Sequence, residues 1–337
     1  MKIGTASAER GEKSSGFLKV TTKPDGTDVG IHVIIVNGLE SGPVLLVDGV
    51  HHGSEHAGYE AILKIANELD PTKLRGTFIG VPILNADAFQ ARTRIGLMDA
   101  QDMNRVYPGR KNGTATEQIV YTYLNEIIPK ADCLITCHGA RDERSPVTYV
   151  GCPAWDESET VKKSIELACV FGTEIITKRV KPSYQGRLMT LSVEKGVPII
   201  LPEIGGTSDI YENRWHYVNL MMRGIKNVMK HLNMMEGETE LPSRQIVARN
   251  DILSCKHGGL WIPEVKGSPE KPGAQKQYVT KGAVLGKIVS PFNIEEELER
   301  IEAPYDGMVI GLYYHPVVYP GDTVIYFGDI LEEIENV

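Results

Sequence analysis

The sequence lacks the features that mark several large classes of protein. Its five cysteines are an odd number with no C-x-x-C pair, which argues against a disulfide framework and a cysteine-built zinc site. It has no lysine–arginine cluster and a formal net charge of −8, so nucleic acid is not an expected partner. Apolar runs such as Val44–Val47 are too short to cross a bilayer, and MKIGTASAERGEKSSG is not a secretory signal. We therefore expect a reduced, cytoplasmic protein with no membrane partner.

What is present is the composition of an ordinary globular protein. Hydrophobic residues make up 42% and charged residues 24% of the 337 residues, enough for two or three domains with sizeable cores. A homo-oligomer is compatible with this composition.

Strands alternate with helices through most of the chain. The expected strands are 29–36, 44–48, 77–83, 132–137, 146–151, 173–177 and 197–201, and the expected helices are 59–69, 116–128, 158–170, 187–195 and 213–232. A polar loop is expected over 85–113. This alternation predicts an α/β domain over 1–237, which includes a short β segment at the N-terminus and has a mixed, mostly parallel sheet flanked by helices.

The pattern changes after the linker-like GETELPS. From Arg244 onward short apolar runs alternate with Gly/Pro turns, and the only helical signal is a turn around 294–300. We therefore predict an all-β module over 238–337.

Three candidate metal ligands follow predicted strands. His52 and Glu55 come after strand 44–48, and His138 ends strand 132–137. Imidazole and carboxylate are normal zinc ligands, and three of them leave a fourth position open for water or substrate. Alone, each is more often a structural residue, and His51 or His56 are rival ligands.

Two further segments supply polar groups at strand ends. Glu203, in LPEIGG, is either a buried ion-pair partner or a general base that takes a proton from water. The loop RTRIGLMDAQDMNRVYPG carries Arg92, Arg94, Asn104 and Arg105. Such a loop is usually a solvated surface, but beside a metal its arginines can bind a carboxylate and neutralise an oxyanion.

In order and context these segments resemble the succinylglutamate desuccinylase/aspartoacylase family of the zinc carboxypeptidase superfamily. The matching motifs are GVHHGSE, NADAFQARTR…DMNRVYPG, ITCH and PEIGG, within about 40–235. The resemblance implies that His52, Glu55 and His138 bind one zinc ion, that Asn104 and Arg105 bind a substrate carboxylate, that Arg94 polarises the scissile carbonyl, and that Glu203 is the base.

The chain departs from the family pattern at several positions. Ser54 replaces Asn or Asp, Met103 replaces Leu, Tyr107 replaces Phe, and Cys137 precedes His138. These changes leave the ligand set intact. Arg92 competes with Arg94 for the oxyanion role, and Arg187 lies too far upstream of Glu203 to align with the extra anion-binding arginine of aspartoacylases.

The C-terminal module resembles the barrel-sandwich hybrid of biotinyl and lipoyl domains. It lacks their swinging-arm lysine, because the relevant stretch reads MVIGLYYHPVVYPG. We interpret it as a structural or site-covering appendage. Tyr313 or Tyr314 could reach the active site, although ordinary packing is the simpler expectation for each.

Together the motifs indicate a zinc-dependent hydrolase that removes the acyl group from a small N-acyl amino acid or related N-acyl amine. Two alternatives remain open at this stage. One is a metallocarboxypeptidase acting on peptide C-termini, and the other is a non-catalytic, metal-binding member of the family.

Overall fold

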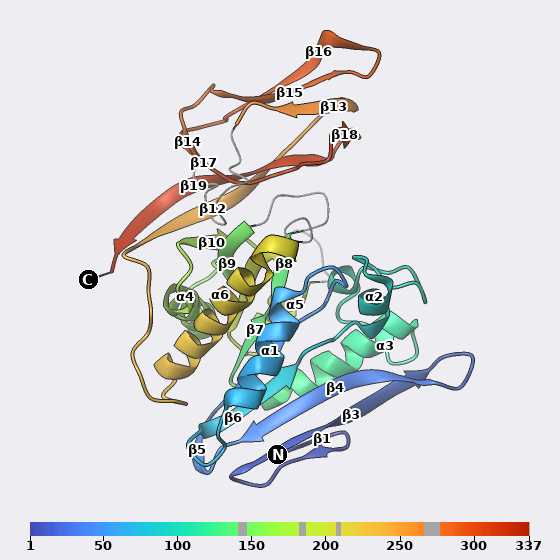
Figure 1. The fold of residues 1–337 in the computed structure, drawn as a ribbon, viewed down its shortest axis with the longest axis vertical. Helices are drawn as coiled ribbons and strands as arrows, with labels where there is room; N and C mark the ends of the chain where they lie inside the picture. The colour runs from blue at the N-terminus through green and yellow to red at the C-terminus, as the bar shows by residue number, and fades with distance from the viewer. Residues whose placement is uncertain (141–146, 182–186, 207–209, 266–276, 337) are drawn as a thin grey trace.

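One twisted sheet runs the length of the protein in the computed structural model, which describes residues 1–140, 147–181, 187–206, 210–265 and 277–336 (Figure 1). From edge to edge its strands are β14 (Gln277–Val279), β17 (Gly307–Leu312), β19 (Thr323–Glu335), β12 (Arg244–Ser254), β10 (Ile175–Arg179), β9 (Val147–Pro153), β11 (Ile199–Gly206), β7 (Cys133–Thr136), β5 (Glu40–Asp48), β6 (Arg75–Val81), β4 (Asp28–Asn37) and β3 (Glu12–Thr22). The short strand β8 (His138–Ala140) also pairs with β11.

Helices cover both faces of the central strands. On one face lie α1 (Ala57–Glu68), α4 (Glu159–Phe171) and α6 (Ile210–His231), and on the other lie α3 (Ala115–Thr122), η2 (Tyr123–Ile127), η3 (Ile128–Lys130) and α5 (Leu188–Glu194). In β5 the side chains of Leu45 and Val47 enter the first core, whereas Leu46 enters the second. The continuous apolar run of β5 reflects this burial on both faces.

The central strands β5, β6, β7 and β11 pair in parallel, so their carboxyl ends meet at one edge. The turn after β5, the segment after β7 and the last residues of β11 therefore lie together. In open α/β sheets ligands bind beyond the carboxyl ends of the strands. The predicted mixed, mostly parallel sheet flanked by helices is confirmed.

The C-terminal strands form an antiparallel sandwich. Strands β12, β17 and β19 of the long sheet face a second sheet of β16 (Asn293–Glu302), β15 (Val284–Ser290), β13 (Gly259–Pro263) and β18 (Val317–Val318). Trp261, Leu285, Ile288 and Phe327 fill the core between the sheets. Because β12 also pairs in parallel with β10, the module continues the sheet of the α/β part. The boundary between 237 and 238 stays a prediction, although it falls between the end of α6 and the start of β12.

Some elements differ from expectation. The helical turn expected around 294–300 is wrong, because this segment is strand β16, paired with β15 in a hairpin. The expected loop 85–113 contains the short helices α2 (Ala86–Ala91) and η1 (Met103–Arg105). Strand β3 and the small pair β1 (Lys2–Ile3) and β2 (Ala6–Ser7) form the short β segment expected at the N-terminus, for which the sequence predicted no individual strands. Within the described ranges, no helix is both long enough and apolar enough to span a membrane.

Candidate active site

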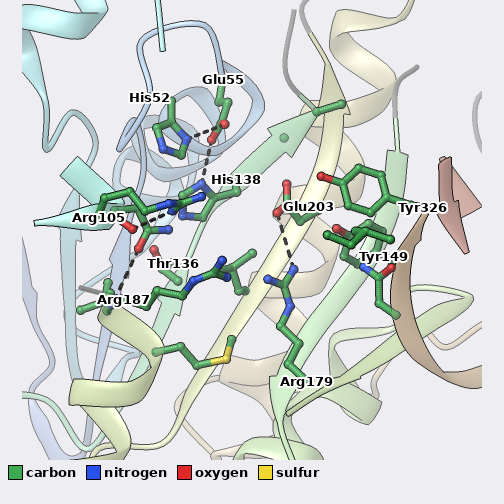
Figure 2. Close-up of a pocket in the computed structure, with 18 of the residues that line it drawn as sticks. His52, Glu55, Arg105, Thr136, His138, Tyr149, Arg179, Arg187, Glu203 and Tyr326 are labelled. Carbon is green, nitrogen blue, oxygen red and sulfur yellow. Dashed lines mark hydrogen bonds and ion pairs between the residues drawn. The ribbon is translucent and has the colours of Figure 1, made fainter. Parts of the chain in front are cut away.

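The structure brings His52, Glu55 and His138 together at the carboxyl edge of the sheet. The Nδ1 atom of His52 lies 2.7 Å from Oε1 of Glu55, and Nδ1 of His138 lies 2.8 Å from Oε2 of the same carboxylate. One ligand atom from each residue lies within 4.8 Å of the other two. All three residues are buried, and Figure 2 shows Glu55 between the two imidazoles.

Close packing shapes the turn that carries His52 and Glu55. A Cβ at Gly53 would lie 1.8 Å from the carbonyl oxygen of Ala88 in α2, so only glycine allows this approach. The rival ligands are directed elsewhere. His51 Nε2 lies 3.0 Å from the Tyr107 hydroxyl, and His56 makes an edge contact with Tyr59.

The donor set fits a zinc ion. Burial lowers the pKa of His138 to about 4, which keeps its imidazole neutral. Although burial opposes charge on Glu55, the two imidazoles lower the pKa of this carboxyl and keep it ionised. Burial opposes charge on His52 too, but the Glu55 and Asp102 carboxylates raise its pKa, so a bound metal ion would displace a proton from this imidazole. Two imidazoles and one carboxylate are the ligands of many catalytic zinc sites. Asp102 Oδ1 lies 3.3 Å from Nε2 of His52, the arrangement that commonly orients a ligating histidine.

Glu203 lies opposite His138 in the register of β11 and β8, and both line one cavity of about 560 Å³. Its Oε1 atom is 3.6 Å from Nη2 of Arg179. Burial and the Glu55 carboxylate raise the pKa of Glu203 to about 7, while Arg179 opposes the rise. A carboxyl with a pKa near neutrality can both accept and return a proton.

The structure separates the two candidate arginines of the loop. Arg94 lines the cavity, and its Nε and Nη2 lie 3.0 and 2.8 Å from Oδ2 of Asp102. This pairing leaves Nη1 3.2 Å from Nδ1 of His52, beside the ligand cluster. Arg92 is the exposed C-cap of α2 and is not part of the cavity lining.

Asn104 and Arg105 line the cavity on the same side. The backbone N–H of Asn104 donates to Asp102 Oδ1, and Nη1 of Arg105 donates to the carbonyl oxygen of Asn104. Asp102 therefore contacts both the ligand His52 and the η1 turn that carries the two expected substrate-binding residues.

Several cavity residues were not selected from the sequence. Arg179 ends β10, Arg187 precedes α5, and Tyr326 comes from β19 of the C-terminal module. Arg179 could have been found, because it follows an expected strand as His138 does. Neither Tyr313 nor Tyr314 lines the cavity. The Tyr313 carbonyl accepts a hydrogen bond from Trp261, and Tyr314 is 42% exposed.

The sequence matches a model of the succinylglutamate desuccinylase/aspartoacylase catalytic domain over residues 41–232, more than half of the chain. The chain belongs to this family. The resemblance inferred from the four motifs is thereby confirmed, and the match places the chain among deacylases.

Individual relatives match along nearly the whole chain. The N-alpha-acetyl-L-2,4-diaminobutyric acid deacetylase of Halomonas elongata is 25% identical over 327 residues, which cover 95% of this chain and 92% of the relative. The product-bound ectoine utilization protein EutE (DoeB) of Ruegeria pomeroyi has a TM-score of 0.85 at 23% identity, covering 96% and 97% of the two chains. A succinylglutamate desuccinylase from Silicibacter sp. TM1040 has a TM-score of 0.84 at 21% identity, covering 98% and 100%. These structures share the fold of this protein.

Proposed function

We propose that the protein is a zinc-dependent deacylase that cleaves the amide bond of a small N-acyl amino acid. The observation that supports this most directly is the shared cavity, in which Glu203 faces a buried His52–Glu55–His138 ligand set. The deacetylase of Halomonas elongata, which matches along 95% of this chain, supports an N-acyl amino acid as substrate.

His52, Glu55 and His138 would hold the metal. When bound there, a zinc ion would lower the pKa of a water toward ~7 and polarise the amide carbonyl. Glu203 accepts the proton of the attacking water and later donates it to the leaving amine, which its pKa of about 7 permits. Arg94 stabilises the negative charge that develops on the carbonyl oxygen, because Asp102 holds its Nη1 beside the ligand cluster.

Arg105 and Asn104 bind the carboxylate of the amino-acid part. The planar fork of an arginine matches a carboxylate in a bidentate contact. Arg187 lies in the same cavity and would bind a second acidic group of the substrate.

The experiment that tests this function is a substrate panel on the zinc-loaded protein. It contains N-acetyl, N-succinyl and N-aspartyl amino acids together with C-terminally free dipeptides, and free amino acid is measured by mass spectrometry. We expect release from at least one N-acyl amino acid, and lower efficiency when its carboxylate is converted to an amide. Release from dipeptides alone would replace the proposal with a carboxypeptidase. No release from any substrate by protein that binds zinc would favour a non-catalytic role.

A further inference from the structure

A buried polar cluster lies directly beneath the metal-ligand turn. His51 precedes the ligand His52, yet its ring points into the interior, and both it and Tyr107 are almost fully buried. Nε2 of His51 lies 3.0 Å from the Tyr107 hydroxyl oxygen. Nδ1 lies 3.2 Å from Oδ1 of Asp48, close enough for an electrostatic contact but without the alignment of a hydrogen bond. Among the described residues, Tyr107 is therefore the side chain with which the His51 imidazole makes a well-aligned hydrogen bond.

The surroundings assign the direction of that hydrogen bond. The Asp48 carboxylate accepts hydrogen bonds from the hydroxyls of Thr136 and Tyr123. The negative charge of this carboxylate favours the tautomer with the proton on Nδ1, which leaves Nε2 as the acceptor. In that tautomer the Tyr107 hydroxyl donates to His51.

Tyr107 belongs to the segment that carries the substrate-binding side chains. It lies two residues after Arg105 and follows the η1 turn, Met103–Arg105. This segment contacts the ligand turn at two points. Asp102 contacts His52 at the cavity side, and Tyr107 contacts His51 on the interior side. The second contact needs a hydroxyl that the phenylalanine of the family pattern does not have.

We infer that Tyr107 is a positioning residue whose hydrogen bond to His51 fixes the metal-ligand turn relative to the loop that carries Asn104 and Arg105. Metal binding places constraints on the turn, and the substrate carboxylate places constraints on the loop. A fixed spacing between them favours both binding events. Loss of the hydrogen bond removes one of the two contacts between the turn and the loop, so zinc affinity and substrate affinity fall together.

The test is Tyr107→Phe, which removes only the hydroxyl, with Tyr305→Phe as the matched control. Tyr305 also donates its hydroxyl to a carboxylate, that of Asp251, but it belongs to the C-terminal module and is not part of the cavity lining. Zinc affinity is measured on chelator-treated protein by competition with a chromophoric chelator, and KM and kcat are measured at saturating zinc. We expect both variants to melt at lower temperature. Only Tyr107→Phe should raise the zinc Kd and KM, each by about 10-fold, with kcat little changed.

His51→Leu removes the other partner of the same hydrogen bond, and it replaces Tyr107→Phe as the test if that variant does not fold. It should raise both constants by a similar factor, and the double variant should be no worse than either single variant, because the two side chains act as a pair. Unchanged constants, a change in only one of them, equal changes in Tyr305→Phe, or multiplying effects in the double variant would each overturn the inference.

Only the KM part of this inference rests on the proposed function. If the wild-type protein binds zinc but hydrolyses no N-acyl amino acid, the proposed function fails. The zinc affinities of the single and double variants would still decide the role of Tyr107.

Discussion

The two walls of the cavity are built in different ways. The ligand wall comes from the carboxyl ends of β5 and β7, and its residues His52, Glu55 and His138 are buried and connected to one another by hydrogen bonds. The opposite wall includes Asn250, Ile252 and Tyr326 from β12 and β19, and Ile252 is 59% exposed. In Figure 2 Tyr326 lies on the far side of Glu203 from the ligands. We expect the first wall to carry the chemistry and the second to contribute only to substrate affinity.

The largest effect should come from breaking the ligand wall at its metal site. His138→Ala removes one of three ligands and should abolish measurable activity while leaving a cooperative melting transition. Zinc content by atomic emission should fall well below one ion per chain. His56→Ala is the control. Because His56 packs against Tyr59 and is not one of the proposed ligands, this variant should retain the metal. Full zinc content in both His138→Ala and His52→Ala would contradict the site.

Removing the base should separate chemistry from metal binding. Glu203→Gln keeps the size of the side chain but cannot accept the proton of water, so kcat should fall at least ~10²-fold with zinc retained. Glu194→Gln, an exposed residue paired with Lys181, is the matched control and should keep full activity. Near-normal turnover in Glu203→Gln would assign the base to another group.

The pKa of Glu203 should also appear in the stability of the metal-free protein. Its folded-state value of about 7 lies above the ordinary 4.5, so the folded state binds this proton more tightly. The stabilisation is complete below about pH 4.5 and is lost as the pH rises through 7, by up to about 3 kcal/mol. Urea unfolding of wild type and Glu203→Gln at pH 5 and 8 measures it. A pH dependence that is equal in both proteins would show that the carboxyl is not perturbed.

The two loop arginines offer a sharper comparison, because only Arg94 lines the cavity. Arg94→Ala should lower kcat by about 10- to 100-fold with little change in KM, because its partner is charge that exists in the transition state. Arg92→Ala changes an exposed helix cap and should leave both constants unchanged. Steady-state kinetics at saturating zinc decide between them, and a kcat loss in Arg92→Ala alone would reverse the assignment.

The smallest effect should come from the opposite wall. Tyr326→Phe removes a hydroxyl from the cavity lining and should raise KM about 3- to 10-fold with kcat nearly unchanged, the value of one lost hydrogen bond. Tyr313→Phe is the control from the same module. A kcat loss as large as that of Arg94→Ala would mean that both walls take part in the chemistry.

Much of the α/β part could be predicted from the sequence because its signals are local. Strand 44–48 and helix 59–69 agree with β5 and α1 within a few residues, since both have clear apolar periodicity. The C-terminal hairpins could be recognised, but not the pairing of β12 with β10, which depends on two strands far apart in the chain. The helical turn predicted at 294–300 is wrong for the same reason, because pairing with β15 overrides the local helical preference of this Glu-rich segment.

The residues of the site also fall into two groups, those that local sequence patterns predict and those that depend on long-range contacts. The sequence by itself determined that the candidate ligands and the candidate base meet at one place, because His52 and Glu55 share one turn and parallel strands place His138 and Glu203 at the same edge of the sheet. Only the tertiary structure decided which arginine faces the ligands and which tyrosine lines the cavity. Arg92 caps α2 and is exposed, whereas Arg94, two residues further along the chain, contacts Asp102 in the cavity. Tyr326 reaches the cavity because β19 pairs with β12, a strand that lies far from it in the sequence. Such choices depend on contacts between distant segments, which local sequence patterns do not contain.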